Sequence, residues 1–333
     1  MNKRNMQLEG LRGIAMLFVV AYHYFFIFPR RFYEPLNHNW LEISVWGYFG
    51  VGIFILISGY FMIGEKKENP VFFTVKKILR LWLPYMVAIT LCFLVTRIVP
   101  LPGRTVSVGA YLANVPFLNG FIGIDYVDGA HWYLTTLIAC AFVAAVISCI
   151  NRKWQSAALF VWLLAILFFQ EINFENRIID LLVDGLYKVL GGRYAAMFVA
   201  GMALKKLKSE KKWENYTTLI AANLINFIVF GWARELVFLL AQMLFCFAEK
   251  QCLPFLNSRL LTWLGMVSFS VYVLHQNIGF WGMYLFSEAI GGYSPVISGV
   301  SMVLAIIAGT ALYYIVEKPW NACIKKKIAA IGG

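Results

Sequence analysis

The stretch "LEGLRGIAMLFVVAYHY" (residues 8–24) decides the fold, because it joins a long apolar run to charged side chains. Every position from Gly13 to Tyr22 is apolar, small or aromatic, yet Arg12 precedes this run and His23 follows it. A helix that crosses the hydrocarbon core needs about 20 predominantly apolar residues, so the stretch predicts a transmembrane helix. Ionisable groups in such a helix face the bundle interior or a wet cavity, because facing lipid is costly.

Arg12 and His23 are predicted to lie on the same face of this helix. Eleven residues rotate an α-helix by about 1100°, which is about 20° past three full turns, and they rise about 16 Å. Arg12 then lies at the inner mouth of the span, and His23 lies near or past the midplane. Each residue also has a purely structural interpretation: Arg12 snorkels to headgroups, and His23 makes an interhelical hydrogen bond. Their shared face favours a functional pair.

The composition indicates one polytopic membrane domain over residues 1–333, with no separate soluble domain. Hydrophobic residues make up 61% of the chain and charged residues 14%, whereas soluble domains have about 45–50% and about 25%. The net charge is +12, but the basic residues lie in short loops between apolar runs. They therefore indicate membrane topology and contact with anionic lipids rather than nucleic acid. The six cysteines form no CxxC pair, so we expect neither a disulfide framework nor a metal site.

Apolar runs of the length of a span predict an all-α bundle of about ten transmembrane helices. The fifth, seventh and eighth runs are short, and Gly231 interrupts a block that is too long for one straight span. The predicted spans are 8–28, 45–63, 81–99, 132–150, 156–170, 186–204, 216–231, 235–248, 260–285 and 296–316.

The distribution of positive charge predicts that both termini are cytoplasmic. Of the 29 Lys and Arg residues, 20 fall in segments assigned to the inner side and six in outer loops. The other three, Arg12, Lys188 and Arg193, fall inside predicted spans. This bias follows the positive-inside rule, and removing one span would invert the later loops and spoil it. The longest outer loop, residues 100–131, is rich in Pro and Gly, which indicates turns.

Further polar residues in or beside the spans are candidates for the same site. A basic collar precedes the third span, where an ordinary positive-inside loop is the plainer interpretation. Buried histidines are also often satisfied packing residues. The candidates are Ser58 in the second span, Lys76, Lys77 and Arg80 in the collar, His131 and Trp132 at the start of the fourth span, and His275 in the ninth.

Six motifs together resemble the acyltransferase-3 family of integral membrane acyltransferases, over about residues 5–320. They are the Arg-x10-His pair of Arg12 and His23, "FILISGY" (54–60), "KKILRLWLPY" (76–85), "HWYLTTL" (131–137), "SFSVYVLH" (268–275) and "VEKP" (316–319). Each motif is weak alone, but their order and spacing are fairly specific. Many members have a glutamate soon after the Trp motif, and "HWYLTTLIA" has none.

The resemblance implies a ten-helix bundle in the cell membrane that takes an acyl group, usually acetyl, from cytoplasmic acyl-CoA. Such a bundle is expected to deliver that group to a hydroxyl of a surface glycan or its lipid-linked precursor. Arg12 and His23 match the family's essential pair, and Arg80 matches its third-helix arginine. Acyl-CoA is a polyanion that suits the basic collar, and a histidine of near-neutral pKa suits a general base.

Three other interpretations of these residues remain open at this point. A covalent acyl-histidine competes with direct transfer. A transporter or flippase for a lipid-linked or small polar substrate would also place histidine and arginine inside a bundle, although the chain shows no inverted repeat. A purely structural membrane protein would not require the alignment of Arg12 with His23. The sequence does not define the acceptor or the oligomeric state.

Overall fold

The computed structural model describes residues 5–33, 44–63, 69–172 and 175–331. These residues form helices and connecting loops, with no strand among them, which confirms the predicted all-α class. Five helical segments of this described part are long and apolar enough to cross a membrane: Met6–Phe32, Pro70–Ile98, Gly129–Cys149, Arg152–Gln170 and Pro295–Ile328. The chain is therefore a membrane helix bundle, and the count of ten spans stays a prediction.

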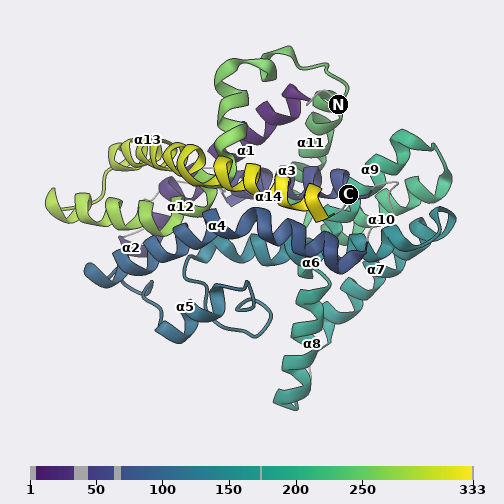
Figure 1. Ribbon diagram of the computed structural model, residues 1–333, viewed down its shortest axis with the longest axis horizontal. Coiled ribbons are helices and arrows are strands. Elements are labelled where there is room, and N and C mark those ends of the chain that lie inside the picture. Colours follow the sequence, from purple (N-terminus) through teal and green to yellow (C-terminus); the bar gives the residue numbers. More distant parts are fainter. Residues whose placement is uncertain (1–4, 34–43, 64–68, 173–174, 332–333) are drawn as a thin grey trace.

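The helices pack around two clusters of buried apolar residues, and Figure 1 shows α13 beside α12 and α6 beside α4. The α-helices are α1 (Met6–Tyr22), α2 (Phe28–Phe32), α3 (Ser44–Met62), α4 (Pro70–Ile98), α5 (Val108–Asn114), α6 (Trp132–Cys149), α7 (Gln155–Glu171), α8 (Arg177–Val189), α9 (Ala195–Ser209), α10 (Trp213–Phe230), α11 (Trp232–Glu249), α12 (Arg259–Ala289), α13 (Pro295–Leu312) and α14 (Lys318–Ile331).

Glycines in the opening stretch bring α1 against α12 at backbone distance. A Cβ atom on Gly10 would overlap the carbonyl of Leu256, in the turn Pro254–Asn257 just before α12, and one on Gly13 would overlap the carbonyl of Leu261 on α12. On the other helix, a Cβ on Gly265 would overlap the carbonyl of Glu9. Small residues allow such close packing between membrane helices. The residue numbers of both helices increase in the same direction along this contact, so α1 and α12 are parallel.

Two π-helical turns interrupt the helices that carry site residues. The first covers His23–Ile27 and the second covers Tyr313–Glu317. Each turn ends two residues before a proline, Pro29 or Pro319. A proline has no N–H and its ring crowds the carbonyl four residues earlier, so the preceding turn widens. Hydrophobic periodicity did not reveal these turns.

The structure corrects one predicted span and confirms one predicted break. The span expected at 186–204 is divided, because α8 ends at Val189 and α9 begins at Ala195. Gly191 and Gly192 have φ of 91° and 57°, which glycine adopts readily and which ends a helix. Gly231, with φ of 82°, separates α10 from α11 as predicted. The outer loop contains turns as expected and also the short helix α5.

Candidate functional site

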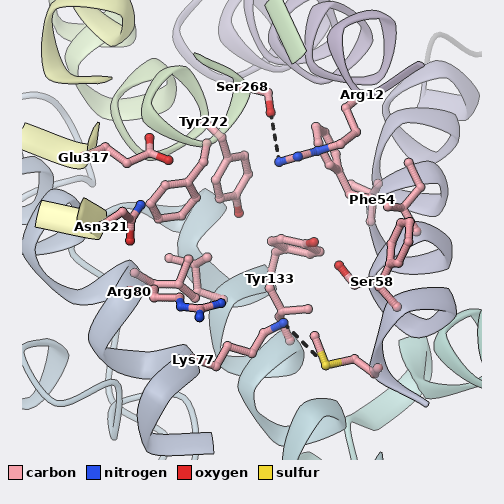
Figure 2. A pocket seen from close by; sticks show the side chains of 18 of the residues that line it. Arg12, Phe54, Ser58, Lys77, Arg80, Tyr133, Ser268, Tyr272, Glu317 and Asn321 are labelled. Carbon is pink, nitrogen blue, oxygen red and sulfur yellow. Dashed lines mark hydrogen bonds between the residues drawn. The ribbon is translucent and has the colours of Figure 1, made fainter. Parts of the chain in front are cut away.

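A cavity of about 720 Å³ opens between α1, α3, α4, α6, α12 and the C-terminal helices. Figure 2 shows its polar side chains arranged around a central space. The apolar wall includes Val19, Phe54, Leu134 and Phe269. The polar lining residues are Arg12, Ser58, Lys77, Arg80, Tyr133, Ser268, Tyr272, Glu317, Asn321 and Lys325. A mostly apolar cavity of this size with a few convergent polar groups is typical of a ligand site.

Positive charge dominates the cavity. Arg80 and Lys325 are exposed at its edge. Arg12 lies further in, where Nη2 donates to Ser268 Oγ at 3.4 Å and Nη1 lies 3.5 Å from Glu9 Oε2. Among the residues that the structure describes, four cations including Lys77 face this space against the single carboxylate of Glu317, which accepts a hydrogen bond from Ser270 Oγ at 2.6 Å. The cavity is therefore suited to a polyanion.

A pair of histidines lies one helical turn beyond the cavity wall. His23 follows the lining residue Val19 by four positions on α1, and His275 follows the lining residue Tyr272 by three positions on α12. His275 Nε2 lies 3.2 Å from His23 Nδ1, and the ring centroids are 4.8 Å apart. Arg12 and His23 thus both contact α12, on the shared face that the sequence predicts.

The hydrogen bonds define which ring nitrogens carry protons. Backbone carbonyls only accept, so His275 Nδ1–H donates to Tyr272 O at 2.6 Å, and His23 Nδ1–H donates to Val19 O at 2.8 Å. In the neutral pair, His275 Nε2 then accepts from His23 Nδ1–H. The lone pair of His23 is left on Nε2, which is the arrangement that a general base requires.

The acyltransferase-3 family profile, described as an acyltransferase domain, matches residues 5–315. The chain belongs to the acyltransferase-3 family. No curated protein and no solved structure matches it significantly. Membership of this family supports an acyltransferase activity, which requires an acyl donor and an acceptor.

The acyltransferase-3 motifs converge on the cavity and the histidine pair, although three of the predicted residues lie elsewhere. Lys76 is not a cavity residue, and its ammonium lies 4.8 Å from the Phe72 ring centroid. Trp132 stacks on Tyr194 with a centroid distance of 4.3 Å. His131 is buried, and its Nε2–H donates to Val273 O at 2.9 Å, so it contacts α12 rather than the cavity.

Several lining residues of this acyltransferase-3 site escaped the sequence analysis. Tyr133 and Tyr272 are buried aromatic residues, and their rings meet edge to face at 5.5 Å. Glu317 lies in the quoted "VEKP" motif, which was the available signal. Ser268, Tyr133 and Tyr272 also lie in quoted motifs, whereas Asn321 and Lys325 lie outside them. Among the described residues, no group of three or more His, Cys, Asp or Glu side chains is arranged to hold a metal ion.

No carboxylate bonds to His23 in the part of the chain that the structure describes. The imidazole of His275 takes the position that a carboxylate has in many base–orienter pairs. The absence of a glutamate in "HWYLTTLIA" is consistent with this arrangement. The Val19 carbonyl and His275 Nε2 are therefore the two partners of His23 Nδ1.

Proposed function

We propose that this protein is a membrane O-acyltransferase that transfers an acetyl group from cytoplasmic acetyl-CoA to a hydroxyl of a cell-surface glycan or its lipid-linked precursor. The observation that carries the proposal is the lone pair on His23 Nε2, one turn beyond a cavity rich in cations. In this proposal His23 is the general base, and the cavity binds the donor.

The donor would enter with its phosphates at the cavity edge. Arg12 and Arg80 offer planar guanidinium groups that pair bidentately with phosphate, and Lys77 and Lys325 add point charges. The rise of about 16 Å from Arg12 to His23 along α1 would be covered by the pantetheine arm. The thioester would then lie beside the imidazole while the nucleotide stays near the inner surface.

The transfer itself needs one base and one acid. His23 Nε2 takes the proton from the acceptor hydroxyl as its oxygen forms a bond to the thioester carbonyl carbon. The carbonyl π electrons move to oxygen, and the tetrahedral intermediate then collapses with cleavage of the C–S bond. The CoA thiolate leaves and takes the proton back from the His23 imidazolium. The products are the acyl ester and free CoA, and the base is regenerated.

The proposed topology places the chain in the plasma membrane as one unit of ten spans with both termini in the cytoplasm. The parallel packing of α1 and α12 supports it, because the first and ninth spans both run from inside to outside. The cavity cations also support it, since Lys77, Arg80 and Lys325 all belong to segments assigned to the positive inner side.

The test measures transfer from labelled acetyl-CoA in inside-out vesicles that contain native glycan precursors. Wild type is compared with His23→Ala and Arg12→Ala at matched protein levels. Lys153→Ala serves as the matched control, because Lys153 is an exposed cation outside the cavity. Label in the glycan fraction with wild type and the control, but with neither site variant, supports the proposal. Full transfer by His23→Ala would refute the base assignment, and no transfer by wild type would favour a transporter.

A further inference from the structure

A short segment of the outer loop binds directly to the turn of α12 that carries His275. His131 Nε2–H donates to the carbonyl of Val273 at 2.9 Å. Asp128 Oδ2 accepts the backbone N–H of Asn277 at 2.8 Å. In a regular helix, these two backbone groups are the acceptor and donor of one hydrogen bond. The loop side chains therefore enter the hydrogen-bond ladder of α12 on either side of His275.

Further bonds hold the same loop segment on this turn. Asn277 Nδ2 donates to the carbonyl of Val127 at 2.5 Å, and the Tyr272 hydroxyl donates to the carbonyl of Ala130. The Arg104 guanidinium, from the same loop, donates to the side-chain oxygens of Gln276 and Asn277 at 3.3 Å each. The position of the His275 backbone thus depends on residues 127–131 as well as on its own helix.

Asp128 is the centre of this contact. Its side chain is completely buried, and its second oxygen, Oδ1, accepts the backbone N–H of Ala130 at 2.9 Å. Burial raises the pKa of Asp128, but the imidazoles of His131 and His275 and the N–H groups of Asn277 and Ala130 outweigh it and bring the pKa below its ordinary value. The carboxylate is therefore ionised at neutral pH.

We propose that Asp128 is a positioning residue for the histidine pair, acting through the turn 273–277 of α12. Its Oδ1 holds the loop together at Ala130, its Oδ2 joins the loop to this turn at Asn277, and the turn places His275 Nε2 within 3.2 Å of His23 Nδ1. Its fixed negative charge also favours the imidazolium that His23 becomes after it takes a proton. This proposal rests on the proposed role of His23 as base.

A merely structural role for Asp128 would have a different signature. Loss of fold would lower the amount of active protein and would affect donor binding and turnover together. The positioning role affects turnover alone, because the cavity lining includes no residue of the segment 125–131. The separation of kcat from KM for acetyl-CoA therefore distinguishes the two roles.

The test uses the full-length protein in detergent and the variant Asp128→Asn. An amide can accept one of the two N–H bonds but presents its own N–H₂ group to the other, and it removes the charge. We expect kcat to fall about 10- to 100-fold, the effect of losing a charge-assisted hydrogen bond. KM for acetyl-CoA should stay within about twofold. Asp125→Asn is the matched control, because Asp125 is exposed in the same loop.

A second readout is independent of transfer. Nitrogen-15 NMR of labelled histidine separates the two neutral tautomers, and the chain has only four histidines. Wild type should show Nδ1–H for His23 and His275, and Nε2–H for His131. Asp128→Asn should shift the His275 and His23 signals, and Asp125→Asn should leave them in place.

Each outcome decides one question. Wild-type kcat in Asp128→Asn, or the same loss in Asp125→Asn, would overturn the positioning role. If Asp128→Asn does not accumulate, the wild-type NMR spectrum still tests the proposal. A proton on Nε2 of His275 would contradict the hydrogen bonds on which the positioning role depends. If wild type transfers no acetyl group, the proposed function fails, and the response of the histidine signals to Asp128→Asn still tests the link from loop to pair.

Discussion

Substitution of Gly279 by alanine tests whether the contact between α1 and α12 sets the histidine pair. Tyr24 is fully buried in the π-helical turn that follows α1, and its hydroxyl donates to the carbonyl of His275 at 2.6 Å. A Cβ atom on Gly279 would overlap this hydroxyl and would lie 2.8 Å from Tyr24 Cε1. The tyrosine ring is rigid and buried, so the two helices must separate or the hydrogen bond must break.

The magnitude follows from three contributions to the free energy of unfolding. Overpacking of a buried contact costs about 1–3 kcal/mol. Loss of the Tyr24 hydrogen bond costs about 1 kcal/mol. Replacement of glycine by alanine inside a helix stabilises the folded protein by about 1 kcal/mol, because alanine has the higher helix propensity. We expect a net destabilisation of about 1–3 kcal/mol, together with a lower kcat because His275 moves relative to His23.

Gly282 is the matched control on the same helix. A Cβ there would have no neighbour within 4 Å, so Gly282→Ala should be neutral or stabilise by up to about 1 kcal/mol. Thermal unfolding in detergent compares the two variants, and Tyr24→Phe measures the hydrogen bond alone. The reasoning predicts opposite signs for the two glycines. Equal melting temperatures for Gly279→Ala and Gly282→Ala, with unchanged kcat, would refute it.

Three further predictions concern the cavity and the histidine pair, and steady-state kinetics with acetyl-CoA tests all of them. Lys77→Met should raise KM about tenfold through loss of a charged phosphate contact, whereas Lys76→Met should change it less than about twofold. KM should rise with ionic strength, because Arg80 is exposed at the cavity edge and salt screens exposed charges; a flat salt dependence would contradict phosphate binding there. His275→Ala should lower kcat about 10- to 100-fold at constant KM, since His23 Nδ1–H loses its side-chain acceptor and keeps only the Val19 carbonyl; an unchanged kcat would exclude His275 as the orienting residue.

Local sequence signals predicted the elements of the fold well. Apolar run length located most of the helices, and the single Gly231 located the break between α10 and α11. The same signals failed where the conformation depends on tertiary context. The pair Gly191 and Gly192 lies inside an apolar run that reads as one span, and only the φ angles show that it ends a helix. The spacing of apolar residues alone also does not distinguish a π-helical turn from an α-helical turn.

The basic side of the cavity was more predictable than the histidine pair. Basic residues at the start of a span are visible in the sequence, and Arg12, Lys77 and Arg80 do line the cavity. Whether a given lysine faces the cavity depends on helix rotation, so Lys76 and Lys77 could not be separated in advance. The aromatic lining residues Tyr133 and Tyr272 belong to the motifs "HWYLTTL" and "SFSVYVLH", but they lie in apolar runs, where hydropathy does not distinguish them from core residues.

The partner of His23 could not be deduced from local pattern, because it lies 252 positions away in the chain. The position of His275 beside His23 depends on the contact between α1 and α12, which begins in the stretch 8–24. Gly10 and Gly13 flank Arg12 and let α1 touch the backbone of α12. That contact places Arg12 next to Ser268 and, farther along the parallel helices, His23 next to His275. In the proposed mechanism the glycines around Arg12 are therefore as important for the base as Arg12 is for the donor, and a bulky side chain at Gly13 should separate the histidines without touching either one.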